Sequence, residues 1–224
     1  TGVSVVGGAV DSARGRVVRA RVGAAVDSTG LLAIGVAERI GAVAGNALAR
    51  EALEELQALA NVHALNTYLG VLRNRSVVYL LACQSSGPIA IRTTVGAETY
   101  LHSTALGKAL LSGVPEEEAK RLLGREPYAR PTRHSKTRFA ALVAELRESR
   151  RSGFAVSDEE NLIGIYAVGA AVRDASGAVV AAISGALPRH EATRARLPQL
   201  ARLITSAAER ISRRLGSTLA RRAA

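Results

Sequence analysis

The chain has 224 residues, and its 30 Lys or Arg against 19 Asp or Glu give it a formal net charge of +11. Hydrophobic residues make up 48% of it, enough for a sizeable core, which excludes wholesale disorder. The single cysteine, Cys83, excludes an intrachain disulfide framework and a cysteine-based zinc site. No apolar run reaches the ~18 residues that span a bilayer, and no signal peptide opens the chain. A cytoplasmic globular protein is therefore expected, although residue 1 is not an initiator Met.

The positive charge is concentrated in two blocks, residues 120–153 and 189–224. Each has a net charge of +7, and we interpret both as surface helices. A basic surface attracts nucleic acid without sequence preference, but a charge run more often marks a solvated helix face. The net charge by itself therefore assigns no partner.

The first sixty residues predict two short strands and a helix. Residues 17–22 and 31–34 are β-prone, and the turn residues 27–30 between them indicate a pair of strands. Apolar residues then recur at helical spacing over 35–60. This helix is interpreted as a linker between domains or a dimer seam, with an ordinary core helix as the alternative.

Residues 61–224 predict one α/β domain. The expected strands are a hairpin over 64–72 and 77–82, a third strand at 89–94, a short strand at 154–157, and a hairpin over 166–173 and 178–186. Four helices are expected. The first spans 103–112, the second begins at Pro115, the third ends at Gly153, and the last carries an apolar stripe from Leu197 to Leu215. Strands and helices do not alternate strictly, which favours a central antiparallel sheet with helices on its faces, an α+β arrangement.

Catalytic motifs are absent. Residues 105–108 (ALGK) fail the Walker pattern, because His102 and Ala109 occupy two of its required positions. No His has a ligand-type neighbour at metal spacing, so we expect no metal, no cofactor and no enzyme. The acidic residues 158–160 could serve acid–base chemistry, but we interpret them as a solvated loop at a strand end.

Residues 101–109 (LHSTALGKA) carry more information. Ser103 or Thr104 can cap a helix whose first amides, at Ala105 and Leu106, have no partner within the helix. Such amides and the positive end of the helix dipole suit a carboxylate. A purely structural cap has the same pattern, so the segment is only a candidate site.

At this point the sequence resembles the effector-binding region of IclR-family transcriptional regulators, over roughly residues 31–216. Five segments match the family's pattern in order: 101–109 (LHSTALGKA), 115–118 (PEEE), 151–160 (RSGFAVSDEE), 164–172 (GIYAVGAAV) and 181–186 (AAISGA). The resemblance implies a GAF-like fold in which a curved antiparallel sheet, flanked by helices, holds a small organic acid. It divides the chain into a partial winged-helix segment (1–34), a linker or dimerisation helix (35–60) and an effector-binding domain (61–224).

The resemblance also implies which residues bind the effector. The carboxylate-binding amides are those of Ala105 and Leu106. The polar side-chain positions fall on Ser157, Ala167, Ser184 and Ala186, and the apolar wall falls on Ile91, Thr99 and Ile165. The family often has Asp, Cys and Ser where this chain has Ser157, Ala167 and Ala186. A less polar and roomier pocket follows, and with it a larger, less polar acid, such as an aromatic one.

A second departure from the family lies at the N-terminus. Residues 1–34 resemble the opening residues and the wing of a winged helix-turn-helix, without the recognition helix that enters the major groove. A deletion or frame disruption, a truncated form, and a gap in the recorded sequence all remain open. The expected function is a regulator that binds operator DNA as a homodimer or homotetramer in the cytoplasm, not at a membrane. The alternative is a stand-alone small-molecule-binding module without DNA binding.

Overall fold

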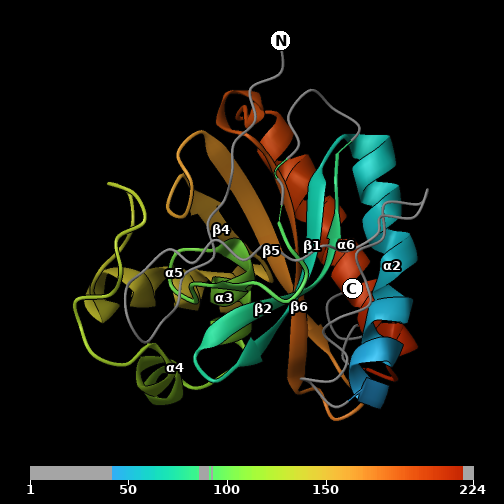
Figure 1. Cartoon of the computed structure of the whole chain (residues 1–224), viewed down its shortest axis with the longest axis horizontal. Helices are drawn as coiled ribbons and strands as arrows, with labels where there is room; N and C mark the ends of the chain where they lie inside the picture. Colours follow the sequence, from blue (N-terminus) through green and yellow to red (C-terminus); the bar gives the residue numbers. More distant parts are fainter. Residues whose placement is uncertain (1–41, 86–90, 92, 219–224) are drawn as a thin grey trace.

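The structure is a computed structural model that describes residues 42–85, 91 and 93–218. A six-stranded sheet forms its middle layer (Figure 1). Helices α2 (Ala42–His63) and α6 (Arg196–Arg214) cover one face of the sheet, and α3 (Ala105–Ser112) covers the other. Helix α5 (Phe139–Ser152) packs on α3, with α4 (Glu116–Leu123) farther out. None of these helices is both long and apolar enough to cross a membrane.

Every described strand pair is antiparallel. The strands are β1 (Asn66–Arg73), β2 (Ser76–Cys83), β3 (Glu98–Thr99), β4 (Ala155–Asp158), β5 (Ile165–Arg173) and β6 (Val179–Pro188), in the sheet order β3-β2-β1-β6-β5-β4. The predicted hairpins are β1–β2 and β5–β6, and a short 3₁₀ turn (Arg189–Glu191) follows β6. The antiparallel sheet with helices on both faces confirms the predicted fold class.

The third strand was predicted in the wrong place. Of the predicted span 89–94, the described residues 91, 93 and 94 lie in no strand, and the strand next to β2 is β3. The physical reason is that side chains of β1 bind the backbone of Ile91. The Asn66 Oδ1 atom accepts from the Ile91 N–H at 3.1 Å, and the Tyr68 hydroxyl donates to the Ile91 carbonyl at 3.0 Å.

The basic block 120–153 is only partly helical, which corrects a second expectation. Residues 124–138 form an irregular connection between α4 and α5. The second block, 189–224, contains α6 as expected. The two short strands predicted before residue 35 and the first residues of the predicted helix 35–60 lie outside the described residues.

The apolar side of helix α2 packs on the sheet of the same chain and on α6. Leu48, Ala52, Leu56 and Leu59 join one hydrophobic core with side chains of both. The Thr67 hydroxyl of β1 donates to the Leu56 carbonyl at 2.9 Å, which fixes the helix along the strand. The apolar stripe is thus used within the chain, and a dimer contact through the described part of α2 would need its outer face.

Glu55 joins α2 to α6, and its replacement by Gln is the first testable change. The Arg210 guanidinium binds both carboxylate oxygens, at 2.9 and 2.7 Å, and Arg214 adds a contact at 3.0 Å. The Arg210 hydrogen bonds hold the pKa of Glu55 below its usual 4.5, outweighing the opposite effect of burial. We expect Glu55→Gln to lower the free energy of unfolding by about 1 to 2 kcal/mol at pH 7.

The pH dependence has a defined sign. Because the folded pKa is depressed, the stabilisation is complete above the unfolded pKa near 4.5 and is lost as the pH falls through the folded pKa. The difference in the free energy of unfolding between parent and variant, measured with urea, should therefore become smaller as the pH is lowered from 6 to 3. Glu54→Gln is the matched control, since Glu54 is exposed on the same helix. A pH-independent difference would contradict the ion-pair account.

Candidate functional site

The start of α3 has the predicted cap. The Thr104 hydroxyl accepts from the Gly107 N–H at 3.0 Å and donates to the Tyr100 carbonyl at 2.6 Å. The Lys108 N–H reaches the Thr104 carbonyl at 3.0 Å. Ala105 and Leu106 are buried, and their N–H groups have no acceptor among the described residues. The helix therefore holds two unpartnered donors and the positive end of its dipole inside the molecule.

A glycine on the sheet lets this helix start come close. An ideal Cβ built on Gly169 of β5 would lie 2.5 Å from the carbonyl oxygen of Ala105 and 2.7 Å from its carbon. Real Cβ atoms do not approach backbone so closely, so any side chain here would push α3 away from the sheet. Gly169 thus sets the distance between the α3 amides and the strands beneath them.

The register of the sheet gathers the four predicted side-chain positions under α3. Ala167 of β5 pairs with Ser157 on one side and Ala186 on the other, while Gly169 pairs with Ser184 in the next row. Because side chains alternate across a strand, these positions share one face. Ser157 donates its hydroxyl to the Ser103 carbonyl at 2.7 Å, which confirms that this face is the α3 side.

The hydroxyl groups of the two serines differ in what they contact. The Ser157 hydroxyl is engaged by the backbone preceding α3. Ser184 is 3% exposed, and its hydroxyl has no partner within the described part of the chain. Ser184 is therefore the side chain of this set with a hydroxyl left for a bound molecule.

The three predicted wall residues also lie on this side of the sheet. Ile91 and Ile165 pack at the edge of the hydrophobic cluster around α3. Thr99 pairs with Val77, a buried member of that cluster. All nine predicted residues therefore border the α3 side of the sheet.

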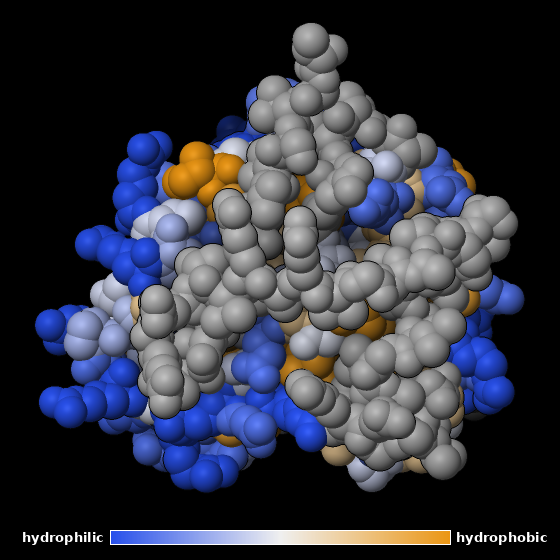
Figure 2. Space-filling model, in the orientation of Figure 1, coloured by the Kyte–Doolittle hydropathy of each residue, from blue (hydrophilic) through white to orange (hydrophobic). Residues whose placement is uncertain are grey.

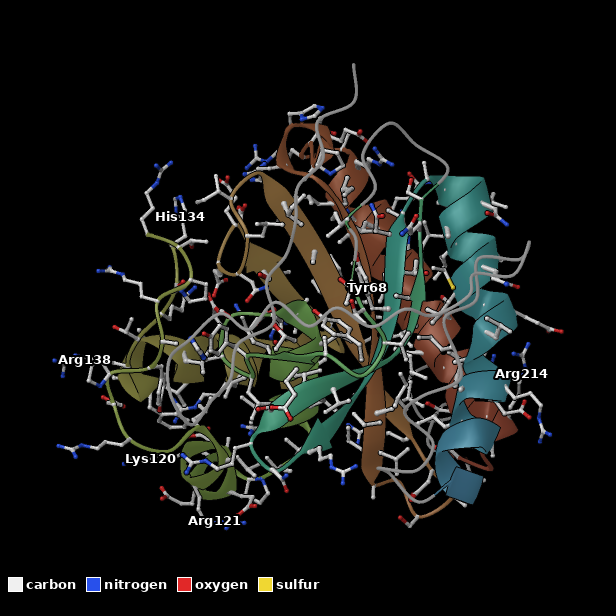
Figure 3. The ribbon with its side chains drawn as sticks, viewed as in Figure 1. Tyr68, Lys120, Arg121, His134, Arg138 and Arg214 are labelled. Atoms are coloured by element: carbon white, nitrogen blue, oxygen red, sulfur yellow. The ribbon has the colours of Figure 1, made fainter. Side chains whose placement is uncertain are left out.

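Two tyrosines of this face were missed by the sequence analysis. Tyr68 of β1 lies in the row of Ser184, and its ring centroid is 5.5 Å from that of Tyr79 on β2. Figure 3 shows Tyr68 in the middle of the molecule. Burial raises the pKa of Tyr68, and it raises the pKa of Tyr79 to about 12 against the opposing hydrogen bond with Thr99. Both hydroxyls stay protonated near neutral pH, so they present neutral dipoles.

The alternation of β1 could have placed Tyr68 on this face, because Leu69 and Val71 belong to the opposite core. Alternation along β2 places Tyr79 on the face of Val77. The register shift between Leu69 and Gly70 lies beyond Tyr79 along β2, so counting gives the wrong face only from Leu81 onward.

One turn beyond the helix start, α3 buries a charge. Lys108 is completely buried, and its ammonium lies 2.6 Å from carboxylate oxygens of both Glu145 and Glu160. Lys136 approaches the same two carboxylates, at 2.7 and 3.3 Å. Glu160 is 4% exposed, so the interpretation of residues 158–160 as a solvated loop was wrong for this residue. The network ties α3 to α5 and to the loop after β4.

A separate cavity of about 420 Å³ opens at the β4 edge. Its lining consists of His134, Lys136, Glu145, Val156, Asp158, Glu159, Glu160 and Arg189. Its cations already face carboxylates, since Arg189 lies 2.5 Å from Asp158 and Lys136 binds Glu145. None of the predicted site residues lines it. Among the described residues, no cluster of three or more His, Cys, Asp or Glu side chains could hold a metal ion.

An antiparallel sheet with a capped helix on one face and two long helices on the other places the chain in the class of α/β domains. The comparisons identify the family. Residues 40–213 match the family described as "Bacterial transcriptional regulator IclR C-terminal". The chain therefore belongs to the IclR family, through its C-terminal domain.

Relatives and solved structures agree with this assignment. The HTH-type transcriptional regulator KdgR of Escherichia coli is 29% identical over 169 residues, which are 75% of this chain and 64% of KdgR. The crystal structure of Thermotoga maritima IclR superposes with a TM-score of 0.70 at 29% identity, covering 81% of this chain and 71% of that one.

A third similar structure is the inducer-binding domain of PobR from Acinetobacter, a double mutant in complex with 3-hydroxybenzoic acid. Its TM-score is 0.65 over 73% of this chain and 96% of that one, and its 22% identity shows the fold alone. The chain spans 55 to 64% of the length of the first curated relatives it matches. Those relatives are named as transcriptional regulators, in agreement with the expectation that the chain is not an enzyme.

Proposed function

We propose that this chain is the effector-binding part of a transcriptional regulator and that it binds a small organic acid between α3 and the sheet. The observation that carries the proposal is the pair of buried amides at Ala105 and Leu106, which have no acceptor among the described residues. A buried donor without a partner costs roughly 1 to 3 kcal/mol, and a bound carboxylate removes that cost. The nine residues predicted from the family pattern border this same space.

The chemistry of the sheet favours a less polar acid. The positions under α3 are occupied by Gly169, Ala167 and Ala186 as well as Ser184, so three of the four carry no polar side-chain atom. Tyr68 and Tyr79 add aromatic faces, against which a ring packs favourably. The PobR domain holds 3-hydroxybenzoic acid in the same fold, which supports the idea that this fold accommodates an aromatic acid. The proposed ligand is thus an aromatic carboxylate.

Titration calorimetry with 4-hydroxybenzoate and with pyruvate tests the ligand class. We expect 4-hydroxybenzoate to bind at least tenfold tighter, since burying an aromatic ring contributes about 1.5 to 3 kcal/mol. Ser184→Ala should weaken binding several-fold, as the loss of one hydrogen bond of about 1 kcal/mol implies. Ser206→Ala, an exposed serine on α6, is the matched control. Tighter binding of pyruvate would overturn the aromatic assignment.

The partners of the whole protein belong to the same proposal. In it, residues 1–34 belong to a winged helix-turn-helix, 35–60 link it to the effector domain, and 61–224 sense the effector. Such a regulator binds palindromic operator DNA as a homodimer or homotetramer and acts in the cytoplasm. The alternative is a stand-alone sensing module. A gel-shift of the complete protein with its promoter DNA distinguishes the regulator from the stand-alone module. If no operator complex forms at moderate salt, only the stand-alone module is left.

A further inference from the structure

The connection between α4 and α5 carries cations that no carboxylate neutralises. Across α4 and α5 themselves, exposed arginines have acidic partners: Arg121 binds Glu118, and Arg151 binds Glu148. From the end of α4 to the start of α5, exposed cations lack such acidic partners in the described part of the chain. Five exposed cations there have no ion pair within the described residues: Lys120, Arg125, Arg130, Arg133 and Arg138. Much of the +7 charge of the block 120–153 is therefore free at this surface.

The backbone that presents these cations is anchored from inside. Thr132 and Ser135 are buried, and their hydroxyls donate to the carbonyls of Glu159 and Glu160, each at 2.7 Å. Tyr128 is also buried, and its N–H donates to the Thr137 carbonyl at 2.8 Å. Irregular as the segment is, it is held on the rest of the domain at several points. A partner would thus need to order only the arginine and lysine side chains.

The side chains point away from the domain. In Figure 3 Lys120, His134 and Arg138 project from the side of the molecule that bears α4 and α5, opposite α2. Figure 2 shows that this margin is strongly hydrophilic. The effector side of α3 lies within the molecule, so occupancy of this surface does not compete with the proposed ligand for the same atoms.

The composition of the surface points to phosphates rather than bases. Four of the five free cations are arginines, whose planar guanidinium binds phosphate oxygens through two hydrogen bonds. The one Phe, Tyr or Trp between positions 120 and 138, Tyr128, is buried, so apart from the imidazole of His134 the segment offers no ring on which an unpaired base could stack. Exposed arginines on an anchored backbone, with no exposed Phe, Tyr or Trp beside them, suit the backbone of duplex DNA.

We propose that residues 120–138 form a second DNA contact, in which the effector domain itself binds phosphates of a DNA duplex without reading its sequence. This surface extends the proposed function, because it gives the regulator a DNA contact outside its winged helix. It does not depend on the identity of the effector or of the operator.

Fluorescence anisotropy of the 224-residue chain with a 30-base-pair duplex of arbitrary sequence, between about 20 and 200 mM salt, tests the proposal. Each phosphate contact contributes about −0.9 to the slope of log K against log salt. The variant R125A/R130A/R138A should therefore lose about two to three units of slope and at least tenfold in affinity at the lowest salt. The matched control is R194A/R202A/R213A, which removes three exposed arginines near α6 that also have no ion pair among the described residues and changes the net charge equally.

The outcomes separate cleanly. A weakened loop variant beside an unchanged control supports the proposal. Equal weakening of both variants would assign the binding to net charge alone and overturn it, as would a parent chain with a negligible salt slope. Calorimetry with 4-hydroxybenzoate on the parent and the loop variant measures acid binding separately. A parent chain that binds DNA but not this acid would count against the proposed function alone, and one that binds the acid but not DNA would count against the DNA contact alone.

Discussion

Replacing Lys108 by Met is expected to lower the free energy of unfolding by about 3 to 4 kcal/mol. The substitution removes one partner of a buried ion network and leaves Glu160, itself 4% exposed, with Lys136 alone at 3.3 Å. Breaking a buried pair from one side typically costs about 3 to 5 kcal/mol, because the remaining charge stays desolvated. Lys136 partly compensates, which places the expectation toward the lower end. Urea unfolding at pH 7 measures the loss.

Two further variants make this result interpretable. Arg151→Met removes an exposed partner of Glu148, and it should change stability by less than about 1 kcal/mol. Adding Glu160→Gln to Lys108→Met removes the orphaned charge and should recover part of the loss. Burial alone would raise the pKa of Glu145, but Lys108 and Lys136 hold it below its usual range. A Lys108→Met protein as stable as the parent would show that the network is not needed for the fold.

Replacing Gly169 by Ala is expected to abolish most of the acid binding while leaving the chain folded. The new methyl group would overlap the Ala105 backbone, and backbone cannot rotate away as a side chain can. Helix α3 must then shift from the sheet, and the amides of Ala105 and Leu106 move with it. Losing one or two hydrogen bonds to a charged ligand costs about 1.5 to 3 kcal/mol, or ten- to hundredfold in affinity.

The matched control lies on the other face of the same sheet. A Cβ on Gly185 would meet the Cδ1 atom of Ile204 at 2.7 Å, the end of a flexible side chain that belongs to the α6 core. Gly185→Ala should therefore lower stability by about 1 to 3 kcal/mol without weakening the binding of the acid. Calorimetry of both variants at 15 °C decides. If the Gly169→Ala protein binds the acid as tightly as the parent protein, the α3 amides are not part of the binding site.

Local rules predicted the elements that depend on neighbouring residues. The two hairpins follow from β-prone runs separated by turn residues, and the α3 cap follows from Thr104 one residue before the first helical position. The positions Ser157, Ala167, Ser184 and Ala186 were found by family resemblance, and strand alternation then explains why they share a face. The third strand failed because Asn66 and Tyr68, more than twenty residues away, hold the backbone of Ile91.

The amino-acid sequence by itself determined the antiparallel α/β class, the capped helix that offers two free amides, and the family to which the chain belongs. These rest on periodicity, on turn and cap chemistry, and on motifs of adjacent residues. Only the tertiary structure decided that Glu160 is buried against Lys108, that Tyr68 and Tyr79 lie on the α3 face of the sheet, and that five cations between the end of α4 and the start of α5 have no ion pair among the described residues. The physical reason is that burial and charge pairing depend on partners far away in the chain, whose distances no local pattern contains.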